Sequence, residues 1–313
     1  MPELALLNSD TILAAVSPTG AIEATRDAFL RHHRGEWTMP SKVYIENYPA
    51  GDFRAMPAMG GDLAMVKWIT SFPGNPAKGL PTVSGVLVMS DASTGVPLAI
   101  LDARAVTALR TGAVAAVASQ ALAGHDAKTV GIVGCGLHGA WAARCMAAAG
   151  YGPGICSDPN AAAAEELAAE LGWQTDGDPF CCDVVCCVTP GHEVVLTKDR
   201  VRTGVHLNML GADGPGKAEA SIEAVQSCEL FCDEWAQASH GGELTGAVEA
   251  GVVTRDDVTD LGAVLAGDAP GRSDHAATTL FDSTGLAIQD LGVAAAALDA
   301  VRAGRVPAQT ITL

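Results

Sequence analysis

Three glycines in the spacing Gly-x-Gly-x-x-Gly constrain the fold more than any other feature of this sequence. An apolar run at 129–133 precedes Gly134, Gly136 and Gly139, and an alanine-rich helical segment at 140–149 follows them. The first glycine permits a tight strand-to-helix turn, the second permits backbone to approach a pyrophosphate, and the third lets the helix pack on the strand. The sequence therefore predicts a strand–turn–helix unit whose helix N-terminus binds phosphate.

An aspartate follows these glycines at about the sequence distance expected for half of a βαβ unit. Asp158 ends the segment 155–158, which we predict to close a second short strand. A carboxylate there accepts a hydrogen bond from a ribose 2'-hydroxyl and repels a 2'-phosphate, so the expected cofactor is NAD(H) rather than NADP(H). An ordinary glycine-rich turn would not account for the strand, helix and aspartate together. We assign cofactor contacts to Thr111, Gly134, Gly136, Leu137, His138, Gly139, Asp158 and Thr189.

Length and composition predict two domains of the α/β class. A chain of 313 residues exceeds the size at which one hydrophobic core usually stays single. Hydrophobic residues make up 49% of it but aromatic residues only 4%, which favours close-packed helices on a sheet over an aromatic-cored β-sandwich. We expect a doubly wound Rossmann domain at 119–289 and a discontinuous α+β domain at 1–118 and 290–313.

Hydrophobic patterning supplies the elements of both domains. In the first, a helix should begin after Ser17 as its N-cap, and a hairpin should turn at 91–95. The strands expected around them, in a mixed and largely antiparallel sheet, are 43–46, 53–56, 63–70, 82–90 and 96–102. Long helices are expected at 103–124 and 285–302, and Rossmann strands near Thr129, Ile155, Val184, Val205 and Glu229.

Charge and cysteine placement narrow the classes of partner. The formal charge of −17, without a basic run, argues against nucleic acid. Neither a signal peptide nor an uninterrupted apolar span is evident, so we expect a soluble, cytoplasmic protein. The nine cysteines lie between Cys135 and Cys232 without zinc spacing, and we interpret them as buried small hydrophobic residues rather than redox or metal sites.

Four segments, in order and across nearly the whole chain, resemble the ornithine cyclodeaminase and mu-crystallin family. They begin with Met-Pro-Ala-Met at 56–59, Val-Lys at 66–67 and Phe-Pro-Gly-Asn at 72–75. The second group runs from Gly-Leu-Pro-Thr at 79–82 to Thr-Ala-Leu-Arg-Thr at 107–111. The last two are Asn-Met-Leu-Gly-Ala-Asp at 208–213 with Gly-Lys-Ala-Glu at 216–219, and the run 279–290 that ends in Gln-Asp.

The resemblance implies a homodimer formed through the first domain, which also binds a small amino or keto acid. Lys67, Thr82 and Arg110 match substrate-holding positions of the family, and Asp213 matches its acid/base carboxylate. The residue types suit these roles, because a guanidinium binds a carboxylate through two hydrogen bonds and a lysine polarises a carbonyl. An aspartate after a strand end can exchange a proton. Lys67 and Asp213 are therefore the expected catalytic residues.

Two positions differ from what the cyclodeaminase branch is expected to carry. Lys42 stands in place of an arginine, and Arg54 in place of a glutamate that could pair with the distal ammonium of ornithine. Arg54 would repel that ammonium and, if it faces the substrate, add a cation suited to a carboxylate. This is similar to the alanine dehydrogenase branch. We therefore expect an NAD-dependent amino-acid dehydrogenase or imine reductase acting on substrates such as alanine and pyruvate, with ornithine cyclodeaminase or a non-catalytic mu-crystallin-like protein as alternatives.

Overall fold

The computed structural model describes residues 3–214 and 216–312, and the chain divides into two compact units. The first unit ends at Arg110 and resumes at Ala287, and the second runs from Thr111 to Leu286. The boundaries expected from sequence, 118/119 and 289/290, fall inside the helices α3 and α10. No proline interrupts either helix near these points, and Gly292 lies inside α10 without ending it.

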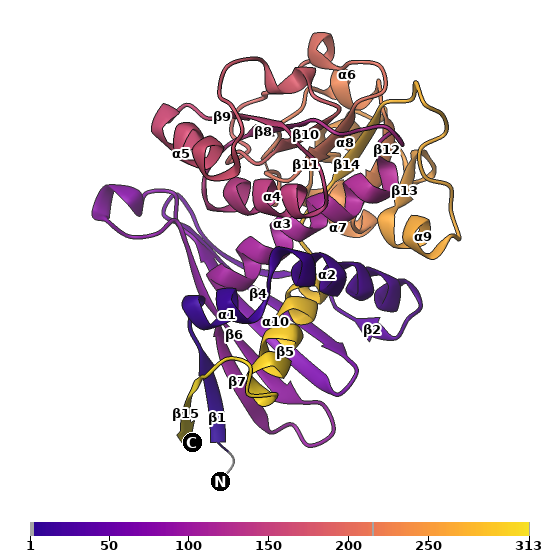
Figure 1. Cartoon of the computed structure of the whole chain (residues 1–313). Coiled ribbons are helices and arrows are strands. Elements are labelled where there is room, and N and C mark those ends of the chain that lie inside the picture. Colours follow the sequence, from indigo (N-terminus) through magenta and orange to yellow (C-terminus); the bar gives the residue numbers. More distant parts are fainter. Residues whose placement is uncertain (1–2, 215, 313) are drawn as a thin grey trace. The chain divides into compact units, whose positions relative to one another are not determined.

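The first unit is an antiparallel-rich sheet with helices on it (Figure 1). Its strand order is β15-β1-β7-β6-β5-β4-β2, with β3 paired to β4, and only the β1–β7 pair is parallel. Its elements are β1 (Glu3–Leu7), α1 (Ser9–Ala15), α2 (Pro18–His33), β2 (Trp37–Thr38), β3 (Val43–Asn47), β4 (Gly51–Gly60), β5 (Leu63–Ser71), the 3-10 helix η1 (Pro76–Lys78), β6 (Val83–Asp91), β7 (Pro97–Asp102), the first part of α3 (Ala103–Leu122), α10 (Ala287–Arg302) and β15 (Gln309–Thr312).

Alternation along the strands gives this sheet one buried face. Met56 on β4, Ile69 on β5 and Leu87 on β6 point to that face, against which α10 packs beside α2. In Figure 1 the yellow α10 lies alongside the indigo α2, although they come from opposite ends of the sequence. The expected N-cap is confirmed, because the Ser17 hydroxyl accepts a hydrogen bond from the N–H of Gly20 at 3.1 Å.

The second unit is a doubly wound parallel sheet, as the glycine motif predicts. Its strand order is β13-β12-β14-β11-β10-β8-β9, and all seven strands pair in parallel. Its elements are β8 (Val130–Val133), α4 (Leu137–Ala148), β9 (Gly154–Ser157), α5 (Ala161–Leu171), β10 (Val184–Cys187), β11 (His206–Met209), α6 (Ile222–Val225), β12 (Glu229–Cys232), α7 (Trp235–Gly241), α8 (Thr245–Glu249), β13 (Val258–Asp260), α9 (Leu261–Ala266) and β14 (Thr279–Asp282).

The chain reverses direction across this sheet between β8 and β10. After β8 it moves outward to β9, and it then returns to place β10 on the other side of β8. In open α/β sheets a ligand binds beyond the carboxyl ends of the strands at such a switch point. The topology therefore directs attention to the loops that follow β8, β9, β10 and β11.

Two sequence expectations need correction or qualification. Seven of the nine cysteines are buried, but Cys181 is exposed and Cys228 is half-buried. Cys181 ends the 3-10 helix η2 (Pro179–Cys181), and Cys228 lies just before β12. Among the described residues, α3 alone is long and apolar enough to cross a membrane. Of its apolar window, 89% is buried inside the protein, which is the environment of a core helix.

Candidate active site

The glycine turn after β8 meets three different steric requirements. Gly134 has φ +96°, and a Cβ added there would lie 2.6 Å from the carbonyl oxygen of Val188. A Cβ at Gly139 would lie 1.8 Å from the carbonyl oxygen of Gly134, so only glycine lets α4 pack this close to the turn. At Gly136 a Cβ would meet no described atom within 4 Å, and this residue caps α4 without a side-chain hydrogen bond. The N-terminus of α4 is therefore open and has no side chain bonded to its backbone N–H groups, which suits a phosphate group.

The carboxylate of Asp158 is fixed against this turn. It directly follows β9, and its Oδ2 accepts the N–H of Cys135 at 2.7 Å while its Oδ1 accepts the N–H of Asn160 at 2.7 Å. Each oxygen keeps a further lone pair, which can accept a hydrogen bond from a hydroxyl group. Its position and acceptor capacity fit a ribose diol beside the pyrophosphate turn.

A buried glutamate holds together the loops that follow β10 and β11. Glu219 Oε1 accepts the N–H of Thr189 at 2.6 Å, and Oε2 accepts the N–H of Gly211 at 2.7 Å. Burial raises the pKa of Glu219, whereas these N–H groups lower it. Glu243 supports it in turn by accepting the N–H groups of Glu219 and Ala220, at 3.0 and 2.6 Å. Two expected site loops are thus held by one side chain.

The expected acid/base residue lies on the second of these loops. Asp213 is half-buried, and its Oδ1 lies 2.6 Å from Nζ of Lys217. The loop follows β11, at the same edge of the sheet as the glycine turn, Asp158 and Thr189. The structure therefore brings the glycine turn, Asp158, Thr189 and Asp213 to one edge of the parallel sheet of the second unit.

Three further expected cofactor residues differ in exposure. Thr111, the first residue of the second unit, is buried, and its hydroxyl has no hydrogen-bond partner among the described residues. Leu137 opens α4 and is exposed, whereas His138 beside it is half-buried. Leu137 is therefore accessible next to the glycine turn, and Thr111 retains an unused hydroxyl.

The expected substrate residues of the first unit form a buried ionic cluster. Lys67 on β5 places Nζ 2.6 Å from Oδ2 of Asp290 on α10, and 3.4 Å from Oγ1 of Thr107 on α3. The Nε of Arg110, one turn after Thr107, lies 3.4 Å from Oδ1 of the same aspartate. Burial lowers the pKa of Lys67 to about 8, opposed by Asp290 and reinforced by the charges of Arg110 and Lys42. The cluster combines two cations with one carboxylate.

Arg54 pairs with a carboxylate that the sequence expectation did not include. Its Nε lies 2.6 Å from Oδ1 of Asp52, and its guanidinium lies 5.3 Å from the centre of the Tyr44 ring. Because strand residues two apart share a face, Asp52 compensates the charge of Arg54 on the buried side of β4. The repulsion of an ornithine ammonium by Arg54 is therefore weaker than the sequence suggested.

Lys42 and Thr82 come from the segments just before β3 and β6. Lys42 is half-buried just before β3, and it influences Lys67 through its charge. Thr82 precedes β6, where its carbonyl accepts the N–H of Phe72 at 2.8 Å. Sequence reasoning missed Asp290, although the run that ends at this residue carried one of the four family matches. It also gave no role to Glu219.

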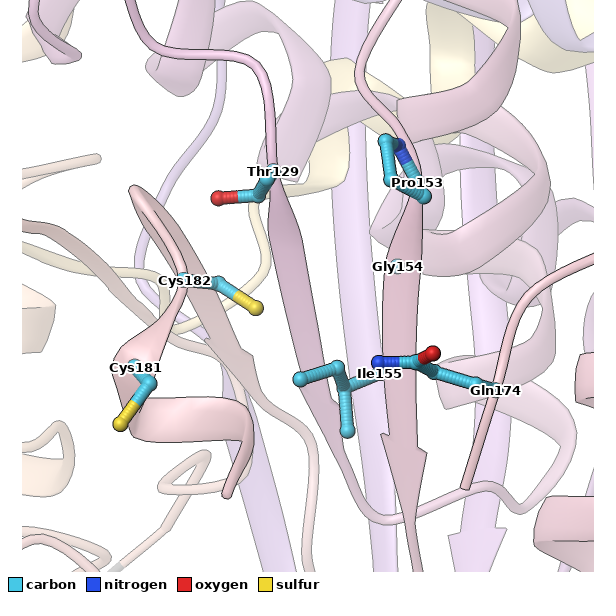
Figure 2. Close-up of a pocket in the computed structure, with 7 residues that line it drawn as sticks. All are labelled: Thr129, Pro153, Gly154, Ile155, Gln174, Cys181 and Cys182. Carbon is cyan, nitrogen blue, oxygen red and sulfur yellow. The ribbon is translucent and has the colours of Figure 1, made fainter. Parts of the chain in front are cut away.

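A small pocket of about 170 Å³ lies at the other edge of the parallel sheet (Figure 2). Thr129 and Gly154 line it from the amino ends of β8 and β9, with Cys181 and Cys182 on a neighbouring segment. Dinucleotides bind beyond the carboxyl ends of such strands. This pocket is therefore separate from the glycine turn and is not the cofactor site.

The sequence model of the ornithine cyclodeaminase/mu-crystallin family matches residues 5–150 and 177–305. The chain belongs to this family. An ornithine cyclodeaminase/mu-crystallin relative, the alanine dehydrogenase of Archaeoglobus fulgidus, is 37% identical over 310 residues, with 93% of each chain covered. The ornithine cyclodeaminase of Agrobacterium tumefaciens is 31% identical over 252 residues, covering 77% of this chain and 69% of that protein. The family expected from the four segments is confirmed.

Solved structures of similar proteins agree with this fold. An archaeal alanine dehydrogenase dimer with bound NAD superposes with a TM-score of 0.94 at 35% identity, over all of both chains. The Δ1-pyrroline-2-carboxylate reductase of Thermococcus litoralis, in complex with NADH and L-proline, gives 0.93 at 27% identity over 98% of this chain and all of that one. The predicted class, a Rossmann domain plus a second domain of the α+β type, is therefore confirmed.

Proposed function

We propose that this protein is an NAD-dependent oxidoreductase that interconverts a small α-amino acid and its α-keto or imino acid, of the alanine and pyruvate type. When bound, the cofactor accepts hydride from the α-carbon or returns it. The imine formed by oxidation adds water and releases ammonia to give the keto acid. The observation that carries the proposal is the excess of one positive charge in the buried cluster of Lys67, Arg110 and Asp290, which matches a monoanionic carboxylate.

The roles of the first unit follow from the geometry of its side chains. The planar guanidinium of Arg110 can hold an α-carboxylate through two N–H groups. The ammonium of Lys67, with a pKa of about 8, is still mostly protonated at neutral pH and can donate a hydrogen bond to a carbonyl oxygen or imine. Lys42 adds a positive charge that attracts the anionic substrate. Thr82 stays a proposed substrate contact.

The second unit supplies the cofactor contacts and the acid/base group. The open glycine turn and the aspartate fixed beside it fit the pyrophosphate and the ribose diol of NAD(H). We assign to the carboxylate of Asp213 the exchange of protons with the substrate nitrogen and with water. Nζ of Lys217 lies 2.6 Å from its Oδ1 and holds the carboxylate in place.

One assay separates this activity from the cyclodeaminase alternative. NADH absorbance is followed with pyruvate plus ammonium, and in parallel ammonia is measured with L-ornithine plus NAD⁺. Oxidation of NADH in the first mixture supports the proposal. Ammonia from ornithine at constant NADH would replace it with cyclodeamination, a family activity that the Asp52–Arg54 pair leaves open.

A matched pair of variants tests whether the protein is catalytic at all. Asp213→Asn should retain NADH binding and lose almost all turnover, whereas Asp256→Asn, an exposed aspartate of the same unit, should behave as wild type. Equal activity in both variants would contradict the role of Asp213. Absence of turnover with any amino or keto acid, together with tight ligand binding, would favour a mu-crystallin-like binding protein.

We further propose that a second copy of the chain covers the outer face of the first sheet. Its exposed apolar side chains include Ile45 on β3, Val66 and Trp68 on β5, and Val86 on β6, and their register places them on one face. Phe53 stacks on Trp68 there with ring centroids 5.7 Å apart. Contiguous apolar surface of this kind marks a protein interface. The archaeal neighbour, described as a dimer, supports the same proposal.

The oligomeric state is tested by mass measurement in solution. Trp68→Arg should convert a dimer into a folded monomer, because a charge on this face opposes burial. Val252→Arg, at an exposed apolar residue of the second unit, is the control and should leave the mass unchanged. A monomeric wild-type protein would refute the proposal.

We expect the cytoplasm as the compartment of this protein, and cell fractionation would test that expectation.

A further inference from the structure

Asp290 connects two cationic side chains that come from different elements. It lies in the first turn of α10, and its two oxygens face Lys67 Nζ at 2.6 Å and Arg110 Nε at 3.4 Å. The side chains of Lys67 and Asp290 are 1% and 0% exposed, and that of Arg110 is 11% exposed. All three belong to the first unit, so their arrangement is internal to one compact body.

Stability alone does not explain such a cluster. Removing charges from water costs several kcal/mol per ion, and well-packed apolar side chains of similar volume are often as stable as a buried ion pair or more so. The neighbouring core of the same sheet face, formed by Met56, Ile69 and Leu87, uses apolar residues of this kind. A chemical role for the charges of Lys67 and Arg110 accounts for their presence, and Asp290 is the carboxylate that compensates them.

The hydrogen bonds of the cluster are incompletely used. The hydroxyl of Thr107 donates to the carbonyl of Ala103 at 2.6 Å and therefore presents a lone pair to Lys67. Nε of Arg110 and Oδ1 of Asp290 face each other without the alignment of a hydrogen bond, and neither has another partner among the described residues. Asp290 therefore binds Lys67 firmly and Arg110 loosely, which leaves the guanidinium able to adjust to a carboxylate.

We infer that Asp290 is a positioning residue, which fixes the ammonium of Lys67, attracts the adjustable guanidinium of Arg110 to its side and keeps Lys67 protonated. The inference rests on the proposed function, in which these two cations hold the substrate. Asp290 itself does not touch the substrate in this scheme. Its effect passes through the place and the charge of Lys67.

Electrostatics gives the direction of the effect. Burial and the charges of Arg110 and Lys42 all disfavour protonated Lys67, and Asp290 is the group that opposes them. An opposite charge at this range shifts a pKa by roughly one to three pH units. Replacing Asp290 by asparagine should therefore lower the pKa of Lys67 further below its present value of about 8.

Three variants separate charge, position and general stability. Asp290→Asn removes the charge at nearly constant size, Asp290→Glu keeps the charge but moves it, and Asp299→Asn removes an exposed charge from the same helix as the control. We expect kcat/KM for the keto acid to fall about 100-fold in Asp290→Asn, since small displacements of positioning groups cost that much. In the pH profile of kcat/KM, the decline of Asp290→Asn at alkaline pH should also begin at a lower pH. The NADH affinity of this variant and the activity of the control variant should stay unchanged.

A direct measurement of Lys67 keeps the test independent of turnover. The chain has six lysines, so a protein labelled with ¹³C at lysine Cε gives few NMR signals, and Lys67→Arg identifies the one of interest. The titration midpoint of Lys67 should drop by roughly one to three pH units in Asp290→Asn and stay near the wild-type value in Asp290→Glu. If the wild type lacks dehydrogenase activity, the proposed function fails, whereas this titration still decides whether Asp290 controls Lys67.

Contrary outcomes are equally specific. An unchanged Lys67 midpoint in folded Asp290→Asn would overturn the inference. The inference would also be overturned if activity, NADH affinity and thermal stability fell together while the pH profile of kcat/KM stayed unchanged. That pattern marks a purely structural residue. If Asp290→Asn does not fold, Asp290→Glu decides alone. Wild-type kcat/KM in that variant would refute positioning, and a loss with the midpoint retained supports it.

Discussion

The carboxylate of Asp158 accepts the backbone N–H of Cys135 at 2.7 Å, which ties the end of β9 to the middle of the glycine turn. This bond uses one lone pair of Oδ2, and Asn160 uses one of Oδ1. The residue expected to select the ribose is therefore held in place by the turn that is expected to bind the pyrophosphate. The residues expected to give selectivity and affinity for the dinucleotide therefore share one local structure.

Replacing Asp158 tests the preference for NAD(H). In Asp158→Ala, NADH should bind about 10- to 100-fold more weakly, since hydrogen bonds to a charged group contribute roughly 1.5–3 kcal/mol. Affinity for NADPH should fall less or rise, because the repulsion of its 2'-phosphate is removed. Fluorescence titration with both nucleotides measures the ratio, with Asp176→Ala, at an exposed aspartate of the same unit, as the control. An unchanged ratio would exclude Asp158 from ribose recognition.

Two glycines of one motif should respond in opposite ways to alanine. In Gly139→Ala the added Cβ meets the carbonyl of Gly134. The free energy of unfolding should therefore fall by about 1–3 kcal/mol or more, the range found for overpacked cores. In Gly136→Ala, with φ −68° and open space around the Cβ, stability should be retained while NADH affinity falls. Thermal melts and nucleotide titrations compare them. Strong NADH binding by a stable Gly136→Ala protein would contradict phosphate approach at this residue.

The alkaline pH dependence should report Lys67. Its pKa is lowered to about 8, so the protonated fraction falls above this pH, and kcat/KM for the keto acid should decline toward tenfold per pH unit. Measurements hold the concentration of free ammonia constant, so that ammonium ionisation does not contribute. Lys67→Arg should lose this limb because a guanidinium stays charged there. Lys128→Arg, at an exposed lysine, should keep it.

Acid stability should depend on a buried histidine of the second unit. Nδ1 of His206 lies 2.8 Å from the Thr279 hydroxyl, and burial lowers the pKa of His206 to about 3. The unfolded chain takes up a proton below about pH 6.5, whereas the folded protein does not until about pH 3. Stability contributed by neutral His206 is therefore lost as pH falls through this window, by about 2 kcal/mol at pH 5.

Urea unfolding at pH 7.5 and pH 5 measures that contribution. His206→Gln should lower stability at both pH values, but its loss on acidification should be about 2 kcal/mol smaller than that of the wild type. His125→Gln is the control, because the His125 side chain is 95% exposed. An equal acid loss in wild type and His206→Gln would show that other groups dominate.

Sequence reasoning succeeded where the determinant is local. The glycine spacing predicted β8, the turn and α4, because each glycine answers a steric demand within a few residues of it. The hairpin between β6 and β7 and the N-cap at Ser17 are likewise short-range features. The family motifs then placed Lys67 and Arg110, which the structure brings to the same carboxylate.

The ion pair that was missed at the candidate site joins residues that are distant in the sequence, whereas two other missed features are local. Lys67 and Asp290 are 223 positions apart, and periodicity carries no signal for such a contact. Asp52 was not recognised as the partner of Arg54, although the alternation of a strand could have suggested it. Strand β14 is four buried residues long, and it was read as a motif rather than as a central strand of the parallel sheet.

In the second unit, two buried carboxylates accept hydrogen bonds from backbone N–H groups of loops that lie beyond the ends of the strands. Glu219 accepts hydrogen bonds from the backbone N–H groups of Thr189 and Gly211, and Glu243 accepts them from those of Glu219 and Ala220. Amides bonded in this way exchange with solvent only when the local structure opens. These loop amides should therefore exchange deuterium on the slow timescale of the sheet, so that the edge with the expected NAD contacts stays ordered even where regular secondary structure has ended.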